Sequence, residues 1–220
     1  QEASIYQCLL TEGKVTGYEV AKQTGISRSN AYNSLASMTE KGAAYLVEEA
    51  STRKYVPVPL NEFCKNRIRK LEESGKWLQE HMPTEKAYVE GYITIEGAEN
   101  ILNKIKNLLS QVDQRVYISC TRNYLLLLIR ELDTLMEERK KVVIITDQPA
   151  TFYNAKVYFG ENRGMQIGII ADSKYVLTGE YGEGSMNTCL YSGQKNFVEL
   201  YKTALANEIK LLSIREENKD

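Results

Sequence analysis

Residues 27–41 carry polar side chains along one face of a predicted helix. At 100° per residue, Ala31, Leu35 and Met38 form a narrow apolar face. Polar side chains lie opposite this face or on its flanks. They are short amides and hydroxyls, one aromatic ring and one guanidinium, from Arg28, Ser29, Asn30, Tyr32, Asn33 and Ser37. Amides and hydroxyls suit the edges of bases, and a helix N-terminus attracts phosphate. The pattern predicts that this helix contacts duplex DNA.

Two further helices must position this one. The first spans about residues 2–12 and ends at Gly13; its apolar stripe, which we expect in the core, comprises Ala3, Ile5, Tyr6, Leu9 and Leu10. Thr16 begins the second helix, where its hydroxyl can accept the backbone N–H of Glu19 and the Glu19 carboxylate can reach back, as a capping box. Ser27 caps the third helix.

A hairpin follows the third helix. The segments AAYLVEE (43–49) and KYVPVP (54–59) surround a predicted tip that offers polar side chains to the DNA backbone, namely Ser51, Thr52, Arg53 and Lys54. Three helices and a hairpin in this order are typical of a winged helix-turn-helix. The predicted DNA-binding residues are Thr16, Ser27, Arg28, Ser29, Asn30, Tyr32, Asn33, Ser37, Arg53 and Lys54. The alternative is a protein-interaction module of the same layout that touches no DNA.

Residues 2–59 resemble the winged-helix domain of the TrmB family of transcriptional regulators. The segments that carry the resemblance are EASIYQCLL, GISRSNAYNSL, EKG and RKYVPVP. The resemblance is close over about a quarter of the chain and extends to the rest in outline. It implies a dimeric repressor or activator, in several members responsive to sugars. Because family members usually carry a few more residues before the first helix, Gln1 is not expected to be the natural N-terminus.

The charge of the chain does not by itself attract nucleic acid. The net charge is −1, and cations and carboxylates balance within residues 1–59. DNA binding must therefore rest on the local placement of Arg28, Arg53 and Lys54, which a dimer would double.

The chain has no apolar run near the ~20 residues of a membrane span and no visible signal peptide. Four widely separated cysteines, Cys8, Cys64, Cys120 and Cys189, fit no zinc spacing, so we expect reduced, mostly buried thiols in the cytoplasm and no metal or cofactor.

Residues 60–83 predict a helix that joins two domains. Apolar or small residues recur at heptad spacing and form a seam of Cys64, Ile68, Leu71, Gly75, Leu78 and Met82, and Pro83 ends the helix. This pattern favours a homodimer held by the helix. The alternative is an amphipathic helix that packs on its own domain. We therefore divide the chain into a winged helix at 1–59, a linker or dimerisation helix at 60–83 and a third part at 84–220.

Residues 84–220 predict an α/β domain. The expected helices span about 97–111, 123–139 and 194–214, and the expected strands span 115–120, 142–146, 165–171, 175–179 and 187–192. A loop containing Pro149, Asn154 and Gly160 follows the second strand. Asp172-Ser173-Lys174 has the composition of a tight turn between the third and fourth strands.

The segment MQIGIIADSKYVLTGEYGEGSMN resembles the phospholipase D signature. A histidine and a lysine two apart belong at Met165 and Ile167, the acidic position is Asp172, and the glycine is Gly179. Methionine and isoleucine supply neither the nucleophile nor the cation of that chemistry. The chain's one histidine, His81, falls at the end of the linker helix. We therefore expect no catalysis, although a phosphodiesterase is the enzyme alternative.

The family resemblance also implies a phospholipase D-like C-terminal domain that holds effectors. Tyrosines, amides and carboxylates in this part suit a polyhydroxylated ligand, and the expected effector residues are Gln166, Asp172, Glu180 and Asn187. The alternative for the tyrosines is half-buried packing in strands. Two non-enzymatic functions remain: a regulator controlled by a small polar metabolite such as a sugar, or a DNA-binding protein whose C-terminal domain serves only assembly or a protein partner.

Overall fold

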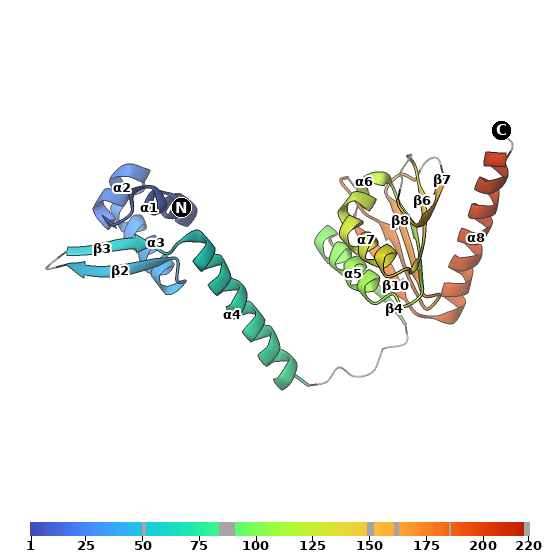
Figure 1. The fold of residues 1–220 in the computed structure, drawn as a ribbon, viewed down its shortest axis with the longest axis horizontal. Helices are drawn as coiled ribbons and strands as arrows, with labels where there is room; N and C mark the ends of the chain where they lie inside the picture. The colour runs from blue at the N-terminus through green and yellow to red at the C-terminus, as the bar shows by residue number, and fades with distance from the viewer. Residues whose placement is uncertain (50–51, 84–90, 149–151, 161–162, 185, 218–220) are drawn as a thin grey trace. The chain divides into compact units, whose positions relative to one another are not determined.

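The computed structural model describes residues 1–49, 52–83, 91–148, 152–160, 163–184 and 186–217 (Figure 1). The chain divides into two compact units, Gln1–Glu85 and Lys86–Asp220. No helix among the described residues is long and apolar enough to cross a membrane. Each unit has its own core and is described by itself.

The first unit begins with three helices and a three-stranded sheet. The helices are α1 (Glu2–Glu12), α2 (Gly17–Thr24) and α3 (Arg28–Glu40). The strands are β1 (Val15–Thr16), β2 (Ala44–Glu49) and β3 (Thr52–Pro57), in the order β1-β3-β2. Figure 1 shows the β2–β3 hairpin extending from the helices. The predicted winged helix-turn-helix is confirmed, with β1 as an unpredicted strand.

Local side-chain bonds start the second and third helices where the sequence places them. The Thr16 hydroxyl accepts the Glu19 backbone N–H at 3.3 Å, and the Glu19 carboxylate accepts the Thr16 backbone N–H at 2.7 Å. This is the predicted capping box. The Ser27 hydroxyl accepts the Asn30 backbone N–H at 3.4 Å and so caps α3.

The core of the first unit lies between the helices and β3. Ile5 and Leu9 of α1 meet the predicted apolar face of α3, and the buried set includes Val20, Ala21, Ala31, Leu35, Met38 and Tyr55. The predicted α1 stripe was too wide, because Ala3 is exposed and Leu10 is 44% exposed. Only one narrow face of α1 meets its neighbours, so these two side chains point away from the core.

The helix α4 (Leu60–His81) has no buried residue. Phe63 packs against the core of the first unit. Beyond it the seam is open to solvent, with Ile68 at 56%, Leu71 at 68% and Leu78 at 48% exposure. Met82 lies just past the helix. Among the described residues of the first unit no side chain buries the seam, which counts against the alternative of a helix that packs on its own domain.

The second unit is built on a seven-stranded mixed sheet in the order β4-β10-β9-β8-β5-β6-β7. The strands are β4 (Tyr92–Glu96), β5 (Arg115–Ser119), β6 (Lys141–Thr146), β7 (Ala155–Phe159), β8 (Gln166–Ala171), β9 (Tyr175–Glu180) and β10 (Thr188–Ser192). The strands β5, β6 and β7 are parallel, and the remaining pairings are antiparallel.

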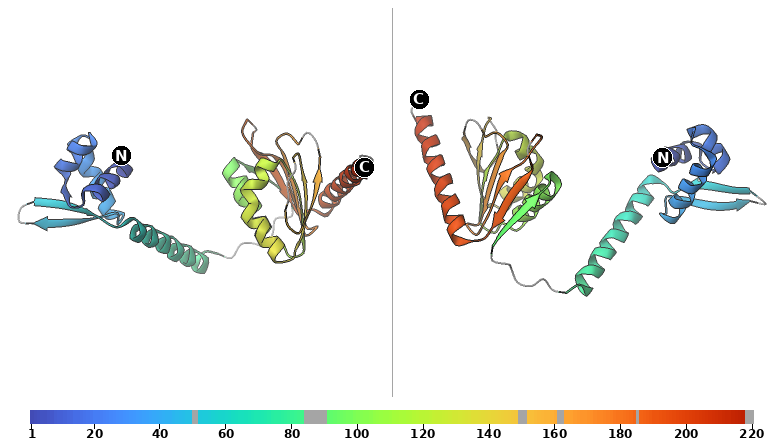
Figure 2. Two further views of the ribbon diagram at one scale, coloured as in Figure 1. Left: turned by 45° about the horizontal axis from the view of Figure 1, so that its top comes forward. Right: turned by 180° about the vertical axis from the view of Figure 1, so that it is seen from behind.

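Helices cover both faces of this sheet (Figure 2). One face carries α5 (Ala98–Ser110), α6 (Arg122–Leu125), a 3-10 turn (Leu126–Leu128) and α7 (Ile129–Glu137). The other face carries α8 (Lys195–Glu217), which packs on β7, β8 and β9. The predicted α/β arrangement is confirmed. Two apolar layers result, one on each side of the sheet.

Three local predictions in this unit were wrong. The helix expected over 123–139 is broken, because Leu128 leaves helical geometry at φ −113° and ψ 7°. The region containing Asn154, expected as a loop, includes the strand β7, which pairs with β6. The edge strand β4 was not predicted.

Candidate nucleic-acid interface

The first half of α3 presents an open polar surface. Arg28, Ser29, Asn30, Tyr32 and Asn33 are all exposed. Their positions lie opposite or beside the buried apolar face, as the periodicity predicts. Exposed amides and hydroxyls are groups that can hydrogen-bond to base edges, and a capped helix N-terminus favours phosphate.

Ser37 does not belong to this surface. It is half-buried in the last turns of α3, and it donates a hydrogen bond to the carboxylate of Glu2 in α1. Hydrogen bonds from Lys41 and then from Ser37 lower the pKa of Glu2. The Ser37 hydroxyl thus joins α3 to α1, and a DNA contact at Ser37 stays a prediction. The Thr16 hydroxyl is likewise committed to the capping box.

Tyr18 completes the surface and was missed in the sequence. Its ring is 49% exposed, and the guanidinium of Arg28 lies 4.5 Å from the ring centroid. This cation–π contact joins the starts of α2 and α3. An exposed aromatic residue two positions after a helix cap was the available signal.

Gly17 brings α2 close to the ring of Tyr32. A Cβ atom at Gly17 would lie 2.5 Å from that ring, which is inside van der Waals contact. The absence of a side chain at Gly17 therefore lets Tyr32 lie over the start of α2, while the Tyr32 side chain remains 43% exposed.

The cations of the hairpin are paired within the hairpin. Arg53 Nε donates to Glu48 Oε1 at 3.1 Å, and Lys54 Nζ donates to Glu49 Oε2 at 3.1 Å. Arg53 and Lys54 belong to β3 and not to the tip. Arg53 and Lys54 would therefore reach the DNA backbone from β3 and not from the tip, and these contacts stay predictions; Ser51 lies outside the described residues. Exposed ion pairs of this kind are weak, so phosphate can compete for Arg53.

A cavity of about 580 Å³ opens beside α5 and α6 in the second unit. It is lined by Ala98, Asn123, Tyr124, Leu127, Tyr181, Gly182, Glu183 and Asn187. The Tyr124 and Tyr181 rings meet edge to face, with centroids 5.0 Å apart. Of the expected effector residues, Asn187 lines this cavity. Its amide is held by Gly182, whose backbone N–H donates to Asn187 Oδ1 at 2.9 Å.

Asp172 lies at the wrong end of the sheet for that cavity. Its carboxylate accepts the backbone N–H groups of Asp113, Gln114 and Arg115 at 2.7, 2.8 and 2.9 Å. Burial opposes ionisation, but these three bonds outweigh it and lower the pKa of Asp172. Asp172 holds the approach to β5 and is separated from Gln166 by the length of β8, roughly 20 Å.

Of the four expected effector residues, Gln166, Glu180 and Asn187 lie at one end of the sheet and Asp172 lies at the other, so the four do not form one site. Gln166 and Glu180 face each other across β8 and β9, at the sheet end where β10 begins. Neither lines the cavity. The additional lining residues Tyr124, Tyr181 and Glu183 come from segments more than fifty residues apart, which no local pattern brings together.

The positions of the phospholipase D signature hold no catalytic groups. Ile167 is buried in the core, and Met165 is 38% exposed. His81 is in the first unit, where its ring stacks on Trp77 with centroids 4.5 Å apart. Among the described residues, no group of three or more His, Cys, Asp or Glu side chains is placed to hold a metal ion.

The four cysteines are free thiols in different surroundings. Cys120 and Cys189 are buried, and burial raises the pKa of Cys120 to about 12 and that of Cys189 to about 11. Both therefore remain neutral at physiological pH. Cys8 is half-buried and Cys64 on α4 is exposed, so the expectation of mostly buried thiols holds for only two of the four.

Residues 1–61 match the model of a protein family described as the sugar-specific transcriptional regulator TrmB. These residues form a TrmB domain. Uncharacterized protein YrhO of Bacillus subtilis (strain 168) is 32% identical over 148 residues, which are 66% of this chain and 53% of that protein. The chain thus spans about half the length of this curated relative.

Solved structures resemble both parts of the chain. TrmBL2, an archaeal chromatin protein whose structure shows a novel mode of DNA binding, is 17% identical, with a TM-score of 0.45 over 95% of this chain and 91% of TrmBL2. NucT from Helicobacter pylori is 16% identical, with a TM-score of 0.44 over 55% of this chain and 97% of NucT. Nuc from Salmonella typhimurium, a phospholipase D family member, is 10% identical, with a TM-score of 0.42 over 53% of this chain and 92% of Nuc.

Proposed function

We propose that this protein is a transcriptional regulator that binds duplex DNA through α3. The observation that supports this proposal is the exposed polar face of α3, formed within a domain that matches the TrmB family. Asn30 and Asn33 offer the paired donor and acceptor that suit adenine. Arg28 and Tyr18 lie beside them and suit phosphate or sugar.

A homodimer is part of this proposal. The seam of α4 exposes apolar side chains at heptad spacing, and a second α4 of the same sequence is complementary to it. In such a dimer two α3 helices would lie about 34–36 Å apart, one turn of DNA, and would read a near-palindromic site.

The second unit suits a small polar metabolite in the cavity beside α5 and α6. The faces of Tyr124 and Tyr181 offer apolar contact, while Asn123, Glu183 and Asn187 offer hydrogen bonds, a combination suited to a sugar. Because Met165 and Ile167 occupy the catalytic positions of the phospholipase D signature, we infer that this unit binds without hydrolysis. The competing proposal is a second unit used only for assembly or a protein partner.

Selection from a random duplex library tests DNA recognition. We expect enrichment of one near-palindromic sequence, and Asn33→Ala should lose about 1–3 kcal/mol of discrimination between that sequence and a scrambled duplex. Asn66→Ala on α4 is the matched control and should discriminate as the parent does. If no sequence is enriched, or if Asn33→Ala discriminates fully, α3 does not read DNA.

A thermal screen of sugars and sugar phosphates tests the effector proposal. A ligand at 100 times its dissociation constant should add roughly 2.7 kcal/mol to stability, and Tyr124→Ala should remove that gain. The same ligand should change operator affinity about 5- to 150-fold in a gel-shift titration. A ligand that stabilises the fold without changing DNA affinity would remove the regulatory role. Hydrolysis of a generic phosphodiester by the pure protein would contradict the absence of catalysis.

A further inference from the structure

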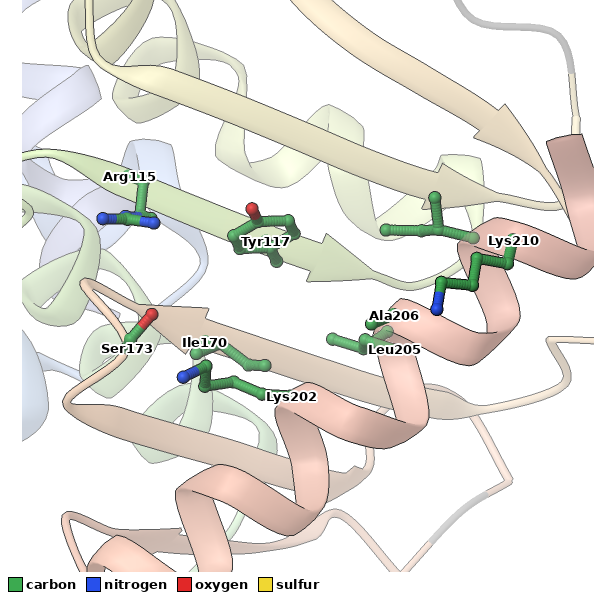
Figure 3. Close-up of a pocket in the computed structure, with 9 residues that line it drawn as sticks. Arg115, Tyr117, Ile170, Ser173, Lys202, Leu205, Ala206 and Lys210 are labelled. Carbon is green, nitrogen blue, oxygen red and sulfur yellow. The ribbon is translucent and has the colours of Figure 1, made fainter.

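A second cavity, of about 320 Å³, lies between α8 and the sheet (Figure 3). Its lining comes from β5, β8, the turn after β8 and α8, and comprises Arg115, Tyr117, Ile170, Ser173, Lys202, Leu205, Ala206, Ile209 and Lys210. It belongs to the α8 side of the sheet and shares no residue with the cavity beside α5 and α6. Its volume falls within the range of small-molecule sites.

The floor of this cavity is apolar. Ile170 and Leu205 are buried, and Tyr117 and Ile209 are partly buried against the same core. Ala206 is the small residue on the facing side of α8. Ala206 is exposed, so it lies at the open side of the cavity, where a larger side chain would take up part of the space.

Cations border the apolar floor at both ends. Lys202, Leu205, Ala206, Ile209 and Lys210 follow the i, i+3, i+4, i+7, i+8 spacing of one helical face, so the face turned to the cavity is apolar between two lysines. In Figure 3, Arg115, Ser173 and Lys202 lie toward one end, and Lys210 lies toward the other.

The cavity contains no counter-charge of its own. None of its lining residues is acidic. Lys202 pairs with the exposed Glu199, whereas Arg115 and Lys210 form no ion pair with any carboxylate that the structure describes. Asp172 is close in sequence, but its carboxylate accepts three backbone N–H groups. An anion that enters the cavity would therefore meet Arg115 without a competing carboxylate, and it would compete with the exposed Glu199 for Lys202.

We propose that this cavity binds a small amphipathic anion with a carboxylate or phosphate head. The head would lie between Arg115 and Lys202, with the Ser173 hydroxyl as a further donor. The apolar body would lie along Tyr117, Ile170 and Leu205. Charge-assisted hydrogen bonds to the head and burial of the apolar body would then both stabilise the same bound ligand. A neutral sugar would give Arg115 no counter-charge and would place hydroxyls on an apolar floor, so this ligand class differs from that of the proposed effector.

Calorimetry on the full chain with octanoate and octyl phosphate tests the proposal. Both are used below their micelle-forming concentrations, and the two arms distinguish a carboxylate head from a phosphate head. We expect saturable binding of at least one probe, weakened by added salt. Octanol, which lacks the charge, and inorganic phosphate, which lacks the apolar body, should each bind at least tenfold more weakly.

Variants locate the site. Arg115→Gln and Lys202→Gln should each weaken binding of the better probe about tenfold, because each removes a charged donor. Ala206→Phe should fill the cavity and abolish binding, with the fold checked by circular dichroism. Arg215→Gln, an exposed change on the same helix outside the lining, is the control and should bind as the parent does.

Three outcomes would overturn the proposal. They are equal binding of octanol, full binding by a folded Ala206→Phe variant, and an equal loss of affinity in Arg215→Gln. If Ala206→Phe misfolds, Ala206→Leu and the two charge variants still decide the question. DNA binding plays no part in these measurements, so they stand apart from the proposed regulatory function.

Discussion

The guanidinium of Arg28 lies 4.5 Å from the centroid of the Tyr18 ring, so the first residue of α3 rests on the start of α2. This contact holds the Arg28 side chain before DNA arrives, which lowers the entropy cost of ordering it in a complex. The pair is therefore the part of the proposed interface that is most directly preorganised.

Tyr18→Ala should weaken operator binding about two- to fivefold, because an exposed cation–π contact contributes about 0.5–1 kcal/mol. Tyr18→Phe keeps the ring and should bind almost as the parent does. In the double variant with Arg28→Ala, the two effects should not add. Fluorescence anisotropy at fixed salt compares the parent, the three single variants (Tyr18→Ala, Tyr18→Phe and Arg28→Ala) and the double variant, and strictly additive losses would show that the two residues act separately.

Gly17→Ala should destabilise the first unit by roughly 1–2 kcal/mol, because the new methyl group would overlap the Tyr32 ring. Removing that ring in Gly17→Ala/Tyr32→Ala should recover most of the loss. Gly75→Ala on α4, where a Cβ meets nothing within 4 Å, is the control and should stabilise the helix. Urea denaturation measures each variant, and a double variant no more stable than Gly17→Ala would contradict the assigned contact.

Arg53→Ala and Glu48→Gln should shift DNA affinity in opposite directions. Arg53→Ala removes a cation that can reach phosphate, so binding should weaken for all sequences and the salt dependence should flatten. Glu48→Gln releases Arg53 from its carboxylate partner and should strengthen binding at low salt. Gel-shift titrations at two salt concentrations give the DNA affinity of each variant and its dependence on salt. If Glu48→Gln has no effect at either concentration, the hairpin does not face the backbone.

Ile68→Glu should shift the protein toward monomer, because it places a charge in the proposed seam. Ile68 is 56% exposed in the single chain, so the substitution should leave the fold of the monomer intact. Asn66→Glu, with the same charge change off the seam, should remain dimeric. Light scattering at micromolar concentration measures the mass, and a monomeric parent protein, with and without operator, would exclude the proposed dimer.

Asp172→Asn should lower the stability of the second unit by about 1–3 kcal/mol at neutral pH, because three backbone donors lose a charged acceptor. The pKa of Asp172 is lowered in the folded protein. Its contribution is therefore fully present above the ordinary carboxyl pKa of about 3.9 and is lost as pH falls through the folded value.

The difference in unfolding free energy between the parent and Asp172→Asn should accordingly become smaller below about pH 4. Asp133→Asn, an exposed change on α7, is the control. Denaturant titrations at pH 7 and pH 3 give the comparison. A gap that is equal at the two pH values would mean that the ionised carboxylate is not the stabilising form.

The features that the sequence predicts correctly in the first unit depend on interactions between residues close together in the chain. The caps at Thr16 and Ser27 act within three residues, and the buried face of α3 follows from helical periodicity alone. Non-local contacts account for what it misses. Val15 is in a strand because it pairs with Tyr55, and Ala155 is in one because it pairs with Val142.

The same division holds for the candidate site. The exposed residues at the start of α3 were predicted from one helix. The role of Ser37 depends on Glu2, and the role of Asp172 depends on a backbone segment 57 to 59 residues earlier in the chain. Neither partnership has a local pattern, so residue type alone could not predict these contacts.

The exposed thiol of Cys64 begins the seam of α4 and can report the direction in which two such helices pair. In a parallel, in-register pair, Cys64 faces its counterpart and mild oxidation would crosslink the two chains. In an antiparallel pair centred on the seam, the two thiols would be about 27 Å apart, far beyond disulfide reach. A crosslinked species on a non-reducing gel would therefore indicate a parallel pair, in which the two winged-helix domains lie at the same end of the proposed helix pair.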